Sequence, residues 1–121
     1  IWPGNSKNNN IHDHNTWSVI GCLVGNEINH TWKRIDDRSK PNYCELEYIE
    51  KIELLPGTVH SHSSSVIHSI ENATPEKGMG VSIHVYGKDL RCTGRRIYLP
   101  DKNMTYLNPN EEFNFLEENR S

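Results

Sequence analysis

The chain has 121 residues, of which 34% are apolar and 24% charged, so we expect a single domain with a modest core. The longest mainly apolar run, residues 19–25, is much shorter than the ~20 residues of a membrane-spanning helix, so no such helix is expected. The net charge is −3. Residues 1–100 carry 11 basic and 11 acidic groups and residues 101–121 carry 2 and 5, so the charge pattern indicates neither nucleic acid nor a membrane as a partner.

The three cysteines, Cys22, Cys44 and Cys92, are widely spaced and include no Cys-x-x-Cys pair. This spacing indicates neither a zinc knuckle nor a disulfide framework. We therefore expect reduced thiols in a cytoplasmic protein. The first residue is Ile rather than Met, which favours a fragment or a processed product.

Short extended segments dominate the chain, and turn residues separate them. The pattern predicts strands over residues 11–14, 17–24, 28–35, 43–54, 66–70, 81–86 and 95–99. No segment between them has the period of a long amphipathic helix, so the pattern favours an all-β sandwich or barrel over parallel βαβ units. The Asn-rich residues 5–10 are expected to form a mobile loop. Residues 101–121 are expected to form an acidic tail with a short helix over 110–118.

Two of the predicted strands alternate clearly at period two. Residues 43–50 alternate in a way that indicates one buried face. In residues 81–86, one face carries Val81, Ile83 and Val85, and the other carries Ser82, His84 and Tyr86. The polar row is either a hydrogen-bond relay, in which the imidazole holds the phenol, or simply a side that faces solvent.

Histidines offer candidate metal ligands. His12 and His14 form His-x-His, and alternate residues of a strand point to the same face, so two imidazoles can converge on one ion. For the third ligand we prefer His68, which lies in a strand-like context. The rivals are His60 and His62, a second His-x-His in a Ser-rich stretch that is typical of a loop.

Three blocks of the chain resemble the thiol dioxygenases, iron enzymes of the cupin fold related to cysteine dioxygenase. The blocks are residues 11–21 (IHDHNTWSVIG), 67–73 (IHSIENA) and 82–87 (SIHVYG). Residues 94–98 (GRRIY) resemble the tail motif of the bacterial 3-mercaptopropionate dioxygenase branch. The order and approximate spacing agree with that family, and the resemblance covers about residues 1–99.

The resemblance implies a cupin double-stranded β-helix, a jelly-roll barrel, as the metal-binding domain over residues 1–100. It implies Fe(II) held by three neutral imidazoles, those of His12, His14 and His68. Many other cupins add a Glu four or five residues after the second His, where this chain has Ser18 and Val19. In mammalian-type members a Cys at the position of Val19 is cross-linked to the relay tyrosine, so no such cross-link is expected here.

The implied reaction adds both atoms of O2 to the sulfur of a small thiol and gives a sulfinate. The relay of Ser82, His84 and Tyr86 is implied to be catalytic. The family binds the substrate carboxylate with an Arg or Gln upstream of His-x-His, a position that this sequence does not include, so we also expect the family's N-terminal helices to be absent from it. Candidate substrate-binding residues are Arg95, Arg96 and Trp17, although Arg95 and Arg96 also fit a solvated basic pair and Trp17 fits a core position.

The implied partners are the thiol, such as 3-mercaptopropionate or cysteine, and O2, in a monomer or homodimer. Asp13, between the two ligands, is expected to point away from the metal, and Cys22 is expected to be a packing residue. Two alternatives stay open: a cupin oxygenase with a non-thiol substrate such as a dicarbonyl, and a cupin that binds a metal without turnover.

Overall fold

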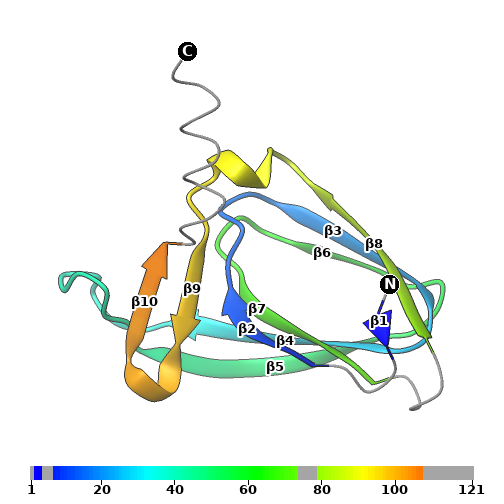
Figure 1. Ribbon diagram of the computed structural model, residues 1–121, viewed down its shortest axis with the longest axis horizontal. Coiled ribbons are helices and arrows are strands. Elements are labelled where there is room, and N and C mark those ends of the chain that lie inside the picture. The colour runs from blue at the N-terminus through cyan, green and yellow to red at the C-terminus, as the bar shows by residue number, and fades with distance from the viewer. Residues whose placement is uncertain (1, 4–6, 74–78, 108–121) are drawn as a thin grey trace.

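The computed structural model describes residues 2–3, 7–73 and 79–107, and these form strands and two short 3₁₀ helices (Figure 1). In chain order the elements are β1 (Trp2–Pro3), β2 (Lys7–His12), β3 (Ser18–Val24), β4 (Glu27–Arg34), β5 (Leu46–Leu54), β6 (Val59–His62), β7 (Ile67–Asn72), β8 (Met79–Tyr86), η1 (Leu90–Cys92), β9 (Arg96–Leu99), η2 (Pro100–Lys102) and β10 (Met104–Leu107). No helix within the described ranges is long and apolar enough to cross a membrane.

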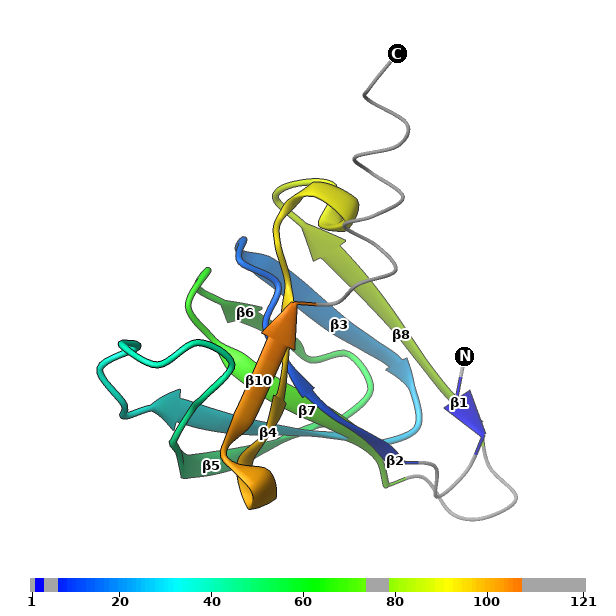
Figure 2. The same ribbon diagram turned by 60° about the vertical axis from the view of Figure 1, so that its left-hand side comes forward.

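The strands form two antiparallel sheets that lie against each other (Figures 1 and 2). The smaller sheet has the order β1-β8-β3-β6 and the larger one β10-β9-β2-β7-β4-β5. Each of the strand pairings between described residues is antiparallel, so the expected all-β class is confirmed. The arrangement is compatible with a β-sandwich or jelly roll.

Three described segments differ from the sequence expectation. Residues 7–10 belong to β2 rather than to a loop, and the Ser-rich stretch around His60 forms β6. Both segments gain backbone hydrogen bonds from a neighbouring strand, because β2 pairs with β7 and β6 pairs with β3, and this outweighs their polar composition. β10, within the expected tail, pairs with β9. The helix expected over 110–118 lies outside the described residues.

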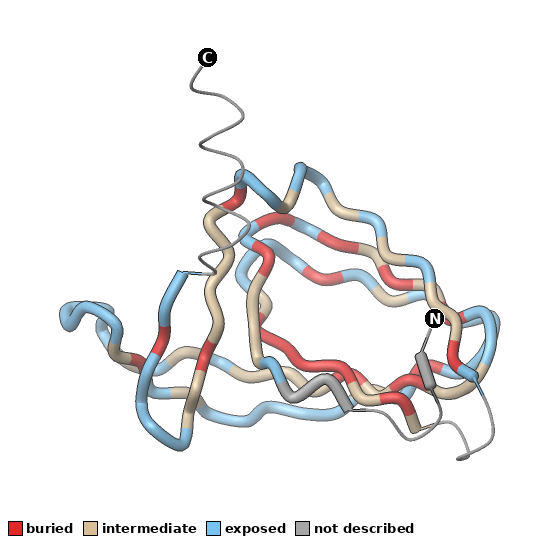
Figure 3. Tube along the Cα trace, viewed as in Figure 1, coloured by how far each residue is buried: buried red, intermediate tan, exposed pale blue. Residues whose placement is uncertain are grey.

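The alternation of β8 is inverted relative to an ordinary half-buried strand. Ile83 and Val85 are 55% and 50% exposed, on the outer face of the smaller sheet, whereas His84 faces the space between the sheets. Figure 3 shows that buried residues recur along β3 and β7, which belong to the two different sheets. The polar row of β8 is therefore not a side that faces solvent.

The other alternating segment is only partly buried. Cys44 is fully buried and Leu46 half-buried, but Tyr48 and Ile49 are exposed. A register shift between Thr31 and Trp32 interrupts the pairing of β4 with β5, and β5 is the outermost strand of its sheet. A single buried face over residues 43–50 was therefore wrong beyond Leu46, because the chain bulges there at a sheet edge.

The apolar core consists of two small clusters. Ile20, Cys22 and Leu54 form one of them, and Cys44, Ile67 and Tyr98 form the other. Cys22 is thus a packing residue, as expected. The three cysteines are free thiols, with only Cys92 exposed.

We predict that Ile20→Ala lowers the free energy of unfolding by about 2–5 kcal/mol, because it removes a fully buried side chain and leaves a cavity. Ile83→Ala is the matched control on the neighbouring strand β8. Its side chain is more than half exposed, so the expected change is within about 0.5 kcal/mol. Urea denaturation followed by tryptophan fluorescence measures both values. Equal losses in the two variants would contradict the described facing of these strands.

Candidate metal centre

Three histidines converge between the two sheets. The candidate ligand atoms of His12, His14 and His68 all lie within 4.8 Å of one another. His12 ends β2, and its cross-strand partner on β7 is His68, so the sheet register places these two side chains together. The Nε2 atoms of His14 and His68 are 2.9 Å apart. The sequence prediction that His68 rather than His60 or His62 joins the first His-x-His is met by this geometry.

Asp13 fixes the His-x-His segment to β9. Its Oδ1 accepts a hydrogen bond from the Arg96 backbone N–H at 2.8 Å, and its Oδ2 accepts one from the Tyr98 hydroxyl at 2.6 Å. The Asp13 N–H donates in turn to the Arg96 carbonyl at 3.2 Å. The carboxylate therefore points away from the histidines, as expected, and it anchors the residue between two candidate ligands.

The second ring nitrogen of each candidate ligand also has a neighbour. His12 Nδ1 lies 2.9 Å from the Asn10 carbonyl, and His68 Nδ1 lies 2.9 Å from Asn29 Oδ1. A carbonyl oxygen only accepts, so both nitrogens carry the proton and both Nε2 atoms keep a lone pair for a metal. His14 differs, because its Nδ1 lies 3.4 Å from Arg95 Nη1, which only donates.

Burial keeps the His14 and His68 imidazoles neutral, as metal ligands must be. Desolvation, followed by the nearby His12, lowers the pKa of His14 to about 3 and that of His68 to about 2. His14 and His68 are 6% and 1% exposed. Three imidazole ligands fit a divalent transition metal such as Fe(II), Zn(II), Ni(II) or Cu(II), and the ligand type alone does not choose among them.

The row on β8 lies beside this cluster. Ser82 Oγ is 2.9 Å from His84 Nε2, and the Tyr86 hydroxyl is 3.4 Å from His84 Nδ1. The Tyr86 and His14 ring centroids are 4.7 Å apart. The three residues that the sequence grouped by period two are therefore in contact, and the tyrosine reaches a candidate ligand.

A buried carboxyl group that sequence reasoning missed adjoins this row. Glu27, on β4, is 5% exposed, and its Oε1 is 3.8 Å from His84 Nε2. Burial raises the pKa of Glu27, and a hydrogen bond with Ser82 partly counters the shift. Glu27 and Asn29 are two residues apart on β4, so both point to its buried face. Two polar residues at this spacing in a strand were the one feature of the sequence that could have indicated a polar interior.

The three predicted substrate-binding residues lie in different places. Arg95 adjoins His14, whereas the Arg96 side chain lines two hollows with Arg34 and Arg38. Alternation along the chain accounts for this difference, since neighbouring residues of an extended strand point to opposite sides. Trp17 is 52% exposed and is not a core residue, because Thr16 and Ser18 on either side of it both point inward and are buried. Its indole packs against the turn at Gly87.

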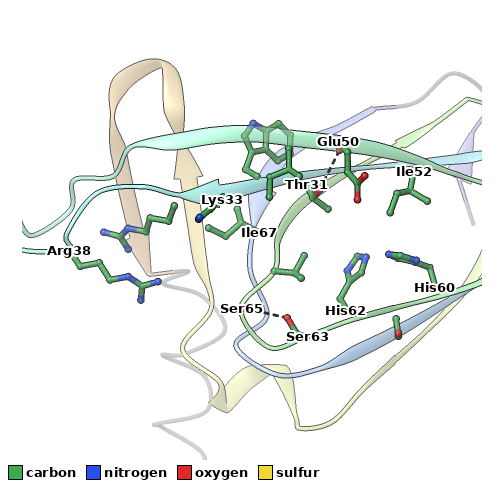
Figure 4. A pocket seen from close by; sticks show the side chains of 15 residues that line it. Thr31, Lys33, Arg38, Glu50, Ile52, His60, His62, Ser63, Ser65 and Ile67 are labelled. Carbon is green, nitrogen blue, oxygen red and sulfur yellow. Dashed lines mark hydrogen bonds between the residues drawn. The ribbon is translucent and has the colours of Figure 1, made fainter.

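His60 and His62 lie together on β6 at one end of a hollow of about 410 Å³, as Figure 4 shows, with Arg38 at the other end. Their ring centroids are 4.8 Å apart. His62 is buried, and its ring centroid lies 5.0 Å from that of His68. The lining of this hollow does not include the three candidate ligands.

No protein-family model matches the chain. The assignment of a function therefore depends on the chemistry of the histidine cluster and its neighbours.

In the metal-free protein, we predict that the free energy of unfolding falls between pH 7.5 and pH 5.5. The unfolded chain takes up protons near pH 6.5, whereas His14 and His68, with folded pKa values of about 3 and about 2, do not. Each of these two histidines contributes a loss of about 1.4 kcal/mol. Burial also lowers the pKa of His62, to about 4, and that of His84, so both add to the loss. Glu27 acts in the opposite direction, because its raised pKa favours the folded state as the pH falls.

Urea denaturation at the two pH values, in the presence of a chelator, measures this difference. His68→Gln removes one of these contributions, so its pH dependence should be smaller by about 1.4 kcal/mol. A wild-type protein that is equally stable at both pH values would contradict the description of these imidazoles as buried and neutral.

Proposed function

We propose that the chain is a cupin-type, Fe(II)-dependent thiol dioxygenase that converts a small carboxylate-bearing thiol into a sulfinate. The observation that carries the proposal is the convergence of three imidazoles beside a Ser82–His84–Tyr86 row. The resemblance of the same residues to the thiol dioxygenases selects this chemistry among the reactions that such a site supports. A homodimer or a monomer in the cytoplasm fits the proposal equally well.

His12, His14 and His68 would hold the metal through their Nε2 atoms. Held by three neutral ligands, Fe(II) would keep its full charge and would supply the centre at which the thiol loses its proton and O2 becomes reactive. The overall step is RSH + O2 → RSO2⁻ + H⁺, in which two S–O bonds form, the O–O bond breaks, sulfur is oxidised by four electrons and O2 is reduced by four.

The Ser82–His84–Tyr86 row would orient the Tyr86 hydroxyl and hold its proton. His84 contacts the tyrosine through Nδ1 and Ser82 through Nε2, so the serine fixes how the imidazole is presented. A hydroxyl aimed at developing charge in a site with little water contributes about 2–4 kcal/mol to catalysis. Glu27, next to the far side of His84, favours a proton on Nε2, so that Nδ1 is left to accept from Tyr86.

Arg95 would bind the substrate carboxylate. Its guanidinium lies next to a candidate ligand and donates to His14 Nδ1. A metal at His14 Nε2 would require the proton to be on Nδ1, which would then no longer accept from Arg95. The guanidinium would instead donate to the substrate carboxylate, the group that it binds best.

The proposal predicts thiol-dependent O2 consumption by anaerobically Fe(II)-loaded protein, with one sulfinate formed per O2. The substrates to compare are 3-mercaptopropionate, cysteine and cysteamine, with uptake measured by an oxygen electrode and sulfinate by mass spectrometry. His68→Ala should abolish the reaction, whereas His60→Ala should not. Tyr86→Phe should lower kcat about 30- to 1,000-fold with iron still bound. Stoichiometric iron without thiol-dependent uptake would refute the proposal and favour a metal-binding cupin without turnover.

Arg95→Gln should raise KM for 3-mercaptopropionate about 10-fold or more, because a charge-assisted hydrogen bond to the carboxylate contributes about 1.5–3 kcal/mol. KM for cysteamine, which has no carboxylate, should change little. Arg96→Gln is the matched control, since the Arg96 side chain lines the two hollows shared with Arg34 and Arg38 and not the histidine cluster. The same change in KM for both thiols would show that Arg95 acts on the site as a whole and does not bind the carboxylate.

A further inference from the structure

His62 belongs to the second His-x-His, which the proposed metal site leaves without a role. It is 6% exposed, on β6 of the smaller sheet, whereas the three candidate ligands belong to segments of the larger sheet or follow one. Its ring centroid is 5.0 Å from that of His68. Its Nδ1 is buried with no hydrogen-bond partner among the described residues, so Nε2 is the nitrogen through which this ring is held.

Asn29 connects the two rings. Asn29 Oδ1 lies 2.9 Å from His68 Nδ1, and Asn29 Nδ2 lies 2.6 Å from His62 Nε2. Asn29 is completely buried and His68 is 1% exposed. Bulk water therefore cannot replace either hydrogen bond, and the Asn29 amide has to pair with both imidazoles at once.

The hydrogen bonds run in one direction, and the Arg95 contact, which at 3.4 Å is the longest of the series, agrees with that direction without fixing it alone. A guanidinium only donates, so His14 Nδ1 accepts from Arg95 and the His14 proton lies on Nε2. That Nε2–H donates to His68 Nε2, which places the His68 proton on Nδ1. His68 Nδ1–H donates to the Asn29 carbonyl oxygen, and the Asn29 amide N–H donates to His62 Nε2.

The opposite orientation of the amide would disable His68 as a ligand. Rotated by 180°, Asn29 would present its NH2 group to His68 Nδ1, and the His68 proton would have to lie on Nε2. Nε2 is the atom that faces His14 and has to carry the lone pair for a metal. An acceptor at His62 Nε2 stabilises the productive orientation, because it takes the N–H that would otherwise be buried without a partner.

We propose that Asn29 and His62 are positioning residues of the metal centre, in which His62 orients the Asn29 amide and the amide in turn holds His68 in the tautomer that binds metal. The proposal rests on the metal site proposed above. It gives the second His-x-His a role that is not ligation. It also makes the metal affinity depend on a residue of the opposite sheet.

The first test is Co(II) binding to the purified full chain, measured by competition with a chromophoric chelator and by the d–d absorption of the bound ion. Asn29→Leu and His62→Phe should weaken Co(II) binding about 10- to 100-fold, as the loss of a ligand's hydrogen-bond partner typically does. Asn29→Asp keeps an acceptor for His68 Nδ1–H and should restore affinity to within a few-fold of wild type. His60→Phe is the matched control on the same strand and should bind Co(II) like wild type.

The second test reads the tautomer directly in metal-free protein, through long-range ¹H–¹⁵N spectra of the histidine rings. His68 should be the Nδ1–H tautomer in wild type and in His60→Phe, and should become a mixture of tautomers in His62→Phe. A role in stability alone would lower the melting temperature but leave the tautomer unchanged. If Asn29→Leu does not fold, the wild-type spectrum and His62→Phe still decide.

An Nε2–H tautomer of His68 in wild type, or unchanged Co(II) affinity in a folded His62→Phe variant, would overturn the proposal. These readouts are independent of turnover. Weakened Co(II) binding in His62→Phe together with no sulfinate in wild type would retain the positioning role and reject the dioxygenase. Sulfinate formation by wild type, together with unchanged Co(II) affinity in His62→Phe, would retain the dioxygenase and reject the positioning role.

Discussion

The space between the two sheets is occupied largely by polar side chains, and most of these are hydrogen-bonded inside the protein. Among the described residues, Ser18 Oγ, Glu27 Oε1 and His62 Nδ1 are buried without a hydrogen-bond partner. The apolar clusters around Ile20 and Ile67 are small, so between them the sheets meet through imidazoles, amides and hydroxyls. Buried polar groups are stable only when they are hydrogen-bonded, and a hydrogen bond fixes direction and distance more narrowly than apolar contact does. The pairing of polar groups in the interior therefore determines both the spacing of the sheets and the orientation of the histidines.

The candidate centre depends on contributions from both sheets. His12 and His68 are cross-strand partners in the larger sheet, and Asp13 fastens the segment between His12 and His14 to β9. The smaller sheet contributes the His84 row and His62. A change in sheet packing would thus move the proposed ligands relative to the proposed relay, even if no residue of either group were altered.

Local pattern was enough to predict the all-β class, most strand positions and the grouping of His12, His14 and His68. Such features depend on period two and on turn residues, which are local. β6 and the first part of β2 were not predictable in this way, because their strand structure comes from pairing with distant strands. The role of Asn29 was equally hidden, since an asparagine acquires it only through two rings that are 39 and 33 residues away along the chain.

The inverted facing of β8 has a consequence for folding. A shift of β8 by one residue against β3 would turn Ile83 and Val85 inward and Ser82, His84 and Tyr86 outward. The hydrophobic effect by itself favours that shifted pairing, and only the polar contacts of the native arrangement oppose it. The contacts of His84 with Glu27 and of Tyr86 with His14 join residues that are far apart in the chain, so they form only when the two sheets meet. The register of β8 is therefore selected by the same contacts that assemble the centre, and not by burial of its apolar residues.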